Sequence, residues 1–386
     1  MNRGATATRY NSRMRPIFLD HNATPPTRPE VWDAVRAAPD GNPSSAHAAG
    51  RAARRALDDA RERVAALLGC EPDEVTFTGG ATEANNLAVF GLVGRGQGAG
   101  GSSAHVLASP LEHPCVTEPL KQLAARGTMI EWLPVSATGV VDPTAVKPRP
   151  DTRLVAVMLA NHETGAVQPV RAVVEAAGGV PVLTDAAQAV GKMPVSFREL
   201  GVAALTVSAH KFGGPKGIGL LMLRSGTPFT PTVFGGHQQG GRRPGTEPVP
   251  LAVGLAVALE LAVRDMEERR AKWVALRRRF VEQLQTAAPI VINGPPDALP
   301  TTLNVSFPGA RADLLLMALD LAGVVCSAGS ACSSGSLLPS PVLRAMGLPD
   351  DVMRSSVRFS FGRDTDFADI DEVADRISPV IQRIRK

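Results

Sequence analysis

Short apolar runs alternate with helical patterns through the first two thirds of the chain. Between the runs lie amphipathic segments such as 82–93 and 170–177. Strands buried on both faces of a parallel sheet have this composition, and each needs a crossover helix before the next strand. The pattern therefore predicts an α/β fold whose large domain holds a mostly parallel, seven-stranded sheet covered by helices. The predicted strands are 75–78, 105–109, 129–135, 154–160, 180–185, 204–209 and 218–223.

The pattern changes in the last third of the chain. Residues 249–285 form one long helical pattern or two consecutive ones, apolar at first and charged later. The remainder predicts a compact α+β domain, with strands at 302–307 and 357–361 and helices at 312–321 and 370–384. We expect a flexible tail over 1–17, a large domain over 18–262, and a small domain over 263–386 that carries the loop around Cys332.

Composition excludes several classes of protein. The chain has 386 residues, of which 44% are hydrophobic and 20% charged, and this suits a folded two-domain protein. No apolar run approaches the ~18 residues of a membrane helix, so we expect no membrane association. The four cysteines form no C-x-x-C pair, which predicts a reducing, cytoplasmic setting and no protein metal site.

Charge adds little to this picture. The net charge is +4, and the basic residues gather in 264–279 without interleaved aromatic residues, so we expect no direct contact with nucleic acid. The first fifteen residues contain arginines and no acid, which a disordered tail or a transit peptide would both show.

Two short strings carry the most information about chemistry. Lys211 follows the apolar strand 204–207 and stands beside Ser208 and His210, so it is a candidate Schiff-base lysine with phosphate-binding neighbours. Cys332 lies in a run of Gly, Ser and Ala that is too small to pack a core. Such a run predicts an exposed loop with a reactive thiol. Together they suggest a carbonyl cofactor that serves a mobile sulfur nucleophile.

Other polar residues follow predicted strands. Gly79-Gly80-Ala81-Thr82 precedes a helix, where backbone N–H groups can hold a phosphate; a turn with Thr82 as helix cap is the plainer alternative. Asp185 ends a strand and could hold a pyridine nitrogen protonated, with Gln188 near the ring oxygen, although a lone Asp is more often a helix cap.

Three further residues have a chemical and a structural interpretation. His113 could stack on a cofactor ring and move protons, or be a satisfied loop residue. Asn161 follows the strand 154–160, and its neighbours His162 and Glu163 are better read as loop-stabilising hydrogen-bond partners than as ligands. Arg358 in an alternating strand suits capture of a carboxylate, or an internal ion pair.

At this point the sequence resembles the cysteine desulfurases of the NifS/IscS type, within the fold-type I, class V aminotransferase-like pyridoxal-phosphate enzymes. The resemblance covers nearly the whole chain. The matching motifs lie at 18–24, 41–45, 81–86, 161–165, 185–188, 208–211, 243–246, 329–332 and 358–362.

The resemblance implies a role for each site residue. Lys211 would bind pyridoxal 5'-phosphate covalently, Asp185 would face its ring nitrogen, Gln188 its ring oxygen, and His113 would stack on the ring and transfer protons. The phosphate would be bound by Ala81, Thr82, Ser208, His210 and, from a neighbouring subunit, Thr246, which implies a homodimer. Asn161 would contact the cofactor, and Asn161 and Arg358 would hold the carboxylate of L-cysteine.

Cys332 would then take the sulfur, leaving L-alanine and a persulfide. The persulfide would pass to an acceptor such as an iron-sulfur scaffold protein, or serve tRNA thiolation. The sequence departs from the family at Pro26, Pro244 and Cys326, and none of these removes a catalytic group.

Two alternatives remain open at the level of sequence. A selenocysteine lyase or a related β-eliminating enzyme would use the same residues on a different substrate. A non-catalytic assembly scaffold would keep the fold without the chemistry, since fold alone does not secure function.

Overall fold

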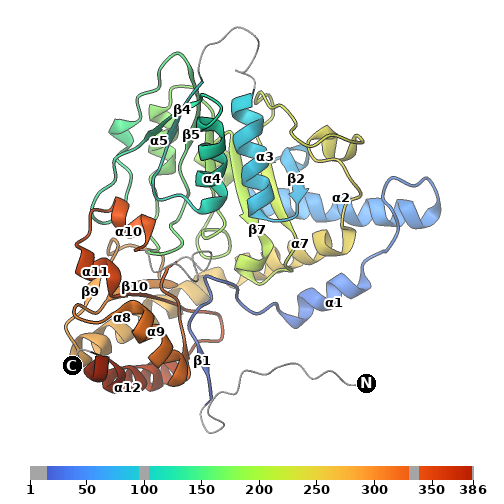
Figure 1. The fold of residues 1–386 in the computed structure, drawn as a ribbon. Helices are drawn as coiled ribbons and strands as arrows, with labels where there is room; N and C mark the ends of the chain where they lie inside the picture. Colours follow the sequence, from blue (N-terminus) through green and yellow to red (C-terminus); the bar gives the residue numbers. More distant parts are fainter. Residues whose placement is uncertain (1–14, 95–103, 330–338, 385–386) are drawn as a thin grey trace, which may run out of the picture.

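A seven-stranded sheet forms the centre of the computed structural model, which describes residues 15–94, 104–329 and 339–384 (Figure 1). β8 runs antiparallel to both of its neighbours, and the remaining neighbours pair in parallel, so the predicted mostly parallel sheet is confirmed. The spatial order is β2 (Val75–Thr78), β8 (Gly219–Leu223), β7 (Ala204–Ser208), β6 (Val182–Asp185), β5 (Thr152–Ala156), β3 (His105–Ala108) and β4 (Met129–Trp132).

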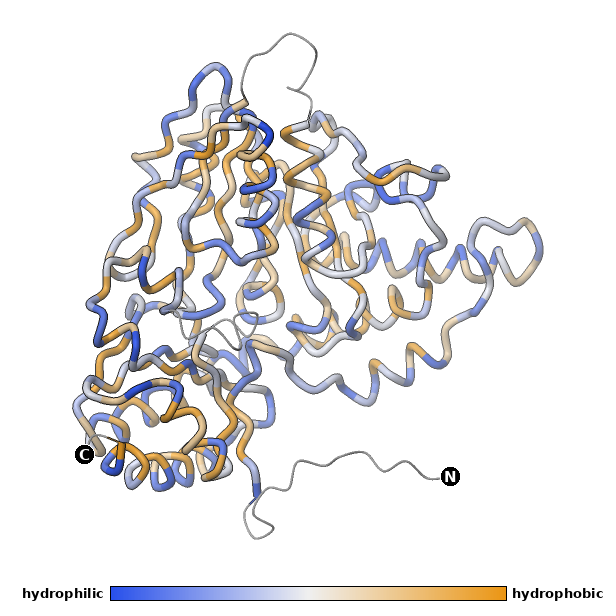
Figure 2. Tube along the Cα trace, in the orientation of Figure 1, coloured by the Kyte–Doolittle hydropathy of each residue, from blue (hydrophilic) through white to orange (hydrophobic). Residues whose placement is uncertain are grey.

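Helices cover both faces of this sheet. α3 (Ala81–Val93) and α4 (Pro114–Ala124) lie in front of the strands in Figure 1, and their apolar side chains form one core with inward residues of β3, β5 and β8. A second core lies on the other face. It is closed by α1 (Pro29–Ala37), α2 (Ala48–Leu68), α5 (Val170–Ala176), α6 (Phe197–Leu200) and α7 (Val249–Arg264). Because both faces are covered, the inner strands β6 and β7 are buried at every position, and Figure 2 shows hydrophobic stretches in the interior of this domain.

The C-terminal region forms the expected smaller α+β unit. A three-stranded antiparallel sheet has the order β12 (Ser356–Ser360), β10 (Thr302–Ser306) and β9 (Val291–Ile292). The helical pattern after residue 249 resolves into two helices, α7 and α8 (Met266–Ala287). α8 packs with α12 (Phe367–Ile384) and α9 (Ala312–Leu321) around a separate core. The short elements are β11 (Val324–Val325), α10 (Pro341–Ala345) and α11 (Asp350–Arg354).

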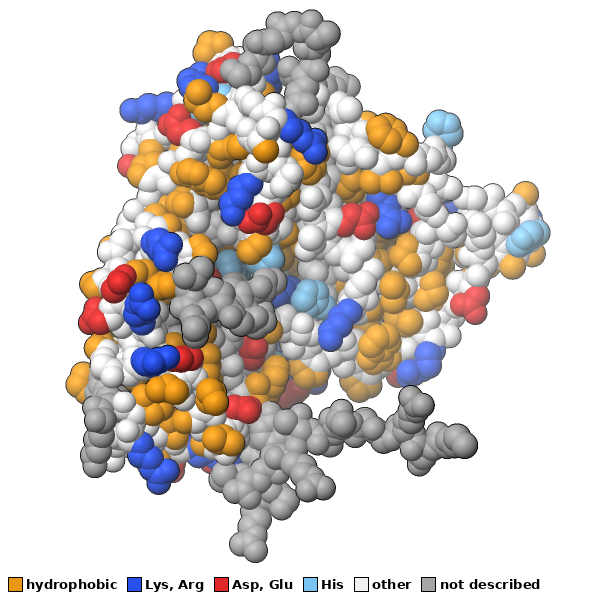
Figure 3. All heavy atoms as spheres, viewed as in Figure 1, with side chains coloured by type: hydrophobic (Ala, Val, Ile, Leu, Met, Phe, Trp, Pro, Cys, Tyr) orange, Lys and Arg blue, Asp and Glu red, His pale blue; other side chains and the backbone are white. Residues whose placement is uncertain are grey.

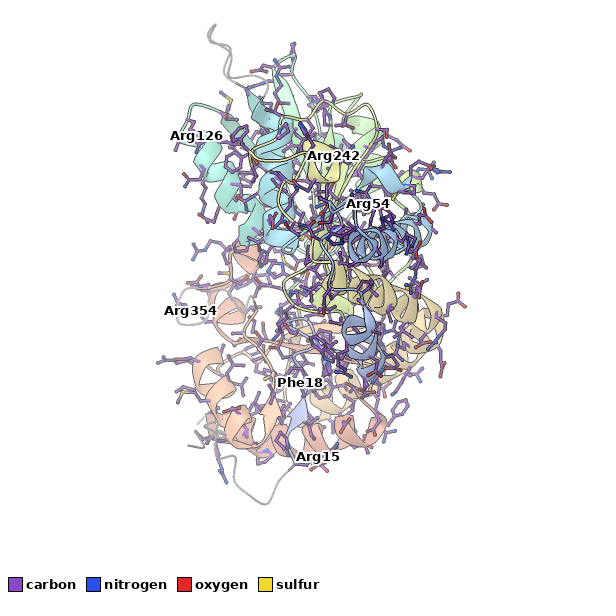
Figure 4. All side chains as sticks on the ribbon, turned by 90° about the vertical axis from the view of Figure 1, so that its right-hand side faces the viewer. Arg15, Phe18, Arg54, Arg126, Arg242 and Arg354 are labelled. Carbon is purple, nitrogen blue, oxygen red and sulfur yellow. The ribbon has the colours of Figure 1, made fainter. Side chains whose placement is uncertain are left out.

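The N-terminal strand belongs to the small domain, which corrects the expected boundary at residues 17 and 18. β1 (Ile17–Phe18) pairs in parallel with β11. Ile17 and Leu19 are buried in the core that α8, α9 and α12 surround. Figure 4 shows Phe18 and Arg15 at this end of the molecule, away from Arg54 and Arg242. Burial of these two apolar side chains stabilises the small domain, so β1 packs there although it lies near the start of the chain.

Among the described helices, none combines the length and apolar character that crossing a bilayer requires.

Candidate active site

A cavity of about 820 Å³ opens at the edge of the large sheet where β6 and β7 end. The residues that follow these strands and β2 line it, and β12 of the small domain contributes Arg358. In Figure 3 histidine side chains gather in a hollow at this level. Ligands of open α/β sheets bind beyond the carboxyl ends of the strands, so the cavity lies where such a fold places its site. The lining includes Ala81, Thr82, His113, Asp185, Gln188, Ser208, His210, Lys211 and Arg358.

Lys211 extends into this cavity from a short 3-10 turn, Ala209–Phe212, directly after β7. Its Nζ donates to the backbone carbonyls of Asn22 at 2.7 Å and Ala23 at 3.0 Å. Gly213 closes the turn with φ of 89°, a left-handed conformation that glycine adopts without strain. The chain therefore fixes the amine at the cavity wall through backbone groups.

Asp185 is a buried acid of the site whose two oxygens both accept hydrogen bonds. Its Oδ2 accepts from Asn85 Nδ2 at 2.8 Å and its Oδ1 from the backbone N–H of Ala187 at 2.9 Å. Burial raises the pKa of this carboxyl, while the two hydrogen bonds act in the opposite direction. A buried carboxyl with both oxygens bonded cannot rotate, so it presents one fixed edge to the cavity.

The start of α3 lies at the cavity, where the sequence predicts phosphate binding. The N-cap of α3 is Gly80, with φ of 146° and no capping side chain, so the plainer interpretation of Thr82 as cap is wrong. A Cβ at Gly80 would lie 3.9 Å from Ser208 Oγ, which shows how closely the two loops approach. His210 Nδ1 lies 3.0 Å from Thr24 Oγ1. The N-terminal end of this thirteen-residue helix, where backbone N–H groups have no partner within the helix, lies at the cavity.

His113 caps α4 through its ring. The backbone N–H of Cys115 donates to His113 Nδ1 at 3.1 Å, so the neutral ring carries its hydrogen on Nε2. Its ring lies edge-on to that of His162, with centroids 5.2 Å apart. Burial, then the neighbouring His162 and Lys211, lower the pKa of His113 to about 3. His113 is thus neutral at physiological pH in this structure.

Cys115 connects His113 with Asp185, a link that sequence reasoning missed. Its Sγ lies 3.0 Å from His113 Nδ1 and 3.6 Å from Asp185 Oδ2, and it accepts from Asn85 Nδ2 at 3.1 Å. Burial raises the pKa of the thiol, with Asp185 adding to the effect. The thiol is therefore a neutral hydrogen-bonding group, unsuited to nucleophilic attack.

Arg358 reaches the cavity from β12. Its guanidinium donates to Asp20 Oδ1 at 2.7 Å and to the His162 carbonyl at 2.9 Å, so the ion pair expected as the alternative is present. Its Nε is buried and has no hydrogen-bond partner among the described residues. The side chain is 2% exposed, and a cavity-lining guanidinium with an unused N–H fits a carboxylate ligand.

Two of the predicted site residues, Asn161 and Thr246, do not line the cavity. Asn161 is fully buried behind the wall, where its Oδ1 accepts the N–H groups of Glu163 and Thr164, each at 2.9 Å. The Asn161 side chain therefore stabilises this loop, and ligand binding by Asn161 stays a prediction. Thr246 is exposed and does not line the cavity. Cys332 lies outside the described residues.

Sequence reasoning also missed Asn22 and Lys192. Both are buried, and Lys192 Nζ donates to Asn22 Oδ1 at 2.9 Å. The motif at 18–24 contained the only signal for Asn22, and Lys192 had none. In the part of the chain that the structure covers, no three His, Cys, Asp or Glu side chains gather as a metal ion would require.

Comparison with known proteins places the chain in a family. The aminotransferase class-V model matches residues 17–373. The chain is similar to the cysteine desulfurase IscS of Dictyoglomus turgidum, with 39% identity over 96% of each chain. An IscS-like cysteine desulfurase of Mycobacterium tuberculosis is also 39% identical, over 96% of this chain and 97% of the relative.

Solved structures agree with this placement. A NifS-like protein superposes with a TM-score of 0.88 and 33% identity, covering 95% of this chain and 100% of that one. The structural similarity spans both domains, so the fold and the sequence motifs indicate the same protein family. The chain belongs to the class-V aminotransferase family, among its cysteine desulfurases of the NifS/IscS type.

Proposed function

We propose that the protein removes sulfur from L-cysteine with the help of pyridoxal 5'-phosphate, yielding L-alanine and a persulfide on Cys332. The observation that carries this proposal is that Lys211 and Asp185 line the same cavity. An amine supplies the covalent link to a carbonyl cofactor, and a fixed carboxyl supports a pyridine nitrogen. Relatives named as cysteine desulfurases support the substrate.

The residues present fit this cofactor. The cavity combines the helix start at Gly80, the Ser208 hydroxyl and the His210 ring for a phosphate with the buried Asp185 carboxyl for a ring nitrogen. A pyridine nitrogen is a suitable partner for a carboxyl whose pKa burial has raised, because the pair shares one proton in a dry site. When bound, the cofactor withdraws electrons from the substrate's Cα.

Four side chains have separate roles in the reaction. Arg358, which lines the cavity, binds the substrate carboxylate through its guanidinium. Lys211 Nζ, held by two carbonyls, takes the proton from the substrate's Cα. His113 presents Nε2–H at the cavity and donates a hydrogen bond from there. The Cys332 thiolate attacks the substrate sulfur, and the new S–S bond forms as the bond between sulfur and Cβ breaks. The electron pair of the broken bond stays on Cβ, which takes up a proton to give L-alanine. Cys332 retains the sulfur as a persulfide for a protein acceptor such as an iron-sulfur scaffold, or for tRNA thiolation.

We further propose that the protein is a cytoplasmic homodimer. Thr246 is exposed on the same loop as Phe234, whose side chain is 87% exposed, and Val233, 44% exposed. Exposed apolar side chains of this size are typical of an interface. A second copy that covers this loop would bring Thr246 to its neighbour's cavity. Sedimentation velocity should give a dimer, and Phe234→Glu should shift it toward monomer.

Substitution of the lysine tests the chemistry. Lys211→Ala should abolish the visible absorption of added pyridoxal phosphate on the protein and the formation of alanine from cysteine. Alanine release by this variant at the wild-type rate would refute the proposal. The alternative of a selenocysteine lyase is tested by comparing the wild-type turnover of cysteine and selenocysteine. Faster turnover of cysteine supports the desulfurase, and turnover of selenocysteine alone supports the lyase.

A further inference from the structure

Lys192 is a buried lysine that the mechanism above leaves without a role. It follows Gln188 by one helical turn, and its side chain lies behind the cavity wall, 7% exposed. Its Nζ donates to the side-chain oxygens of Gln188 and Asn22, the latter at 2.9 Å. Burial, then the charges of Lys211 and Arg358, lower the pKa of this amine well below its ordinary value. A neutral amine still has two hydrogens, so both bonds survive deprotonation.

Two partners fix the orientation of the Gln188 amide. The backbone carbonyl of Asn22 can only accept, so the Gln188 nitrogen faces it, and the Gln188 oxygen faces Lys192 Nζ, which donates to it. One hydrogen of this NH₂ goes to the Asn22 carbonyl at 3.0 Å. The second hydrogen is left for the cavity, which Gln188 lines.

The Asn22 carbonyl joins this arrangement to Lys211. It accepts from Gln188 Nε2 at 3.0 Å and from Lys211 Nζ at 2.7 Å. The Asn22 side chain is bound on both sides, by Lys192 at its oxygen and by Thr302 Oγ1 at its nitrogen, 2.8 Å away. A displaced Asn22 side chain would loosen the same peptide that holds the Lys211 amine.

We propose that Lys192 is a positioning residue that acts through Gln188 and Asn22. It directs the Gln188 NH₂ toward the ring oxygen of the bound cofactor. It also maintains the hydrogen bond from Lys211 Nζ to the Asn22 carbonyl. The proposal rests on the proposed binding of pyridoxal phosphate in this cavity. A donor at the ring oxygen stabilises its anionic form, so loss of that donor moves the titration of the bound cofactor to higher pH.

The test is a double-mutant cycle read by spectroscopic pH titration. Lys192→Met should raise the midpoint of the visible absorption change of bound cofactor by about one pH unit, the order expected for loss of one hydrogen bond to a charged group. Gln188→Ala should raise it similarly. The double variant should shift the midpoint by less than the sum of the two single shifts, because part of the effect of Lys192 passes through Gln188. Lys147→Met, the same change at an exposed lysine, should titrate like the wild type.

Two results would overturn the proposal. One is a Lys192→Met protein that titrates with the wild-type midpoint, and the other is shifts that add in the double variant. Lys192→Gln retains a donor and provides a second variant: it should restore the wild-type midpoint, and a midpoint displaced as far as that of Lys192→Met would also count against the proposal. Circular dichroism checks the fold of each variant. If the wild type forms no visible band with pyridoxal phosphate, the proposed function itself fails, and this inference falls with it.

Discussion

Asn85 Nδ2 donates to Asp185 Oδ2 at 2.8 Å, across one hundred residues of sequence. Asn85 comes from α3 and Asp185 from the end of β6, and Thr206 Oγ1 on β7 completes the set by donating to Asn85 Oδ1 at 2.8 Å. Three neighbouring elements thus fix one carboxyl. All three side chains are buried, so each bond lacks competition from water.

Asn85→Leu should therefore weaken both the fold and the site. The substitution conserves size but leaves the Asp185 and Thr206 oxygen groups without this partner, at a cost of about 1–3 kcal/mol in the free energy of unfolding. Urea unfolding measures the loss, and a titration should show weaker binding of pyridoxal phosphate. Gln122→Leu, a similar change at an exposed position of α4, should leave both quantities unchanged. Equal effects of the two substitutions would contradict the assigned role of Asn85.

Stability should fall on acidification because His113 is buried in its neutral form. Its pKa is about 3 in the folded chain against an ordinary 6.5, so the unfolded chain binds the extra proton first. The unfolding free energy should then decrease as pH drops from about 6.5 toward 3, by about 2 kcal/mol between pH 7 and pH 5 as an upper value.

His113→Gln should remove that part of the pH dependence. Urea unfolding of the cofactor-free protein at pH 7 and pH 5 measures it, and substitution of the exposed His237 by Gln is the matched control. His21 and His210, whose pKa values burial lowers to about 4, should maintain a residual dependence in the variant. An unchanged pH slope for His113→Gln would argue against a neutral buried ring.

Arg358→Lys should raise the KM for cysteine. A lysine cannot present the Nε and Nη donors of a guanidinium together, so the substrate carboxylate loses one charge-assisted hydrogen bond. This loss should lower the affinity for cysteine by about 10- to 100-fold. Steady-state kinetics measure this change. Arg354→Lys, at an exposed arginine of α11 labelled in Figure 4, should retain wild-type kinetics. A fall in kcat with unchanged KM would mean that Arg358 has a different task.

The two C-terminal cysteines should differ in function. Burial, then the nearby Asp20, raise the pKa of the Cys326 thiol, so it is a poor nucleophile at neutral pH. Cys326→Ser should release alanine from cysteine, in the presence of dithiothreitol, at close to the wild-type rate. Cys332→Ser should still bind the cofactor but should release no alanine. Full activity of Cys332→Ser, or its loss in Cys326→Ser, would reverse the assignment.

Much of the fold could be read from the chain because its strands are buried on both faces. Apolar runs such as 204–208 and 219–223 have few alternatives to a central strand, and Gly-rich or polar residues mark where each strand ends. The antiparallel direction of β8 had no signal in sequence. The loop from β7 to β8 is short and contains Gly213 and Gly214, and only the pairing in space shows its reversal.

The candidate site divides in the same way. Lys211, Asp185 and the turn at Gly79 and Gly80 were predictable, because each lies directly after a strand and parallel strands carry such residues to one edge. The sequence alone determined which groups could do chemistry, since reactive side chains and strand ends are local properties. Only the tertiary structure decided which neighbours orient them. The hydrogen bonds of Asn22 and Lys192 are made between segments about 170 residues apart, and no local pattern encodes a contact of that range.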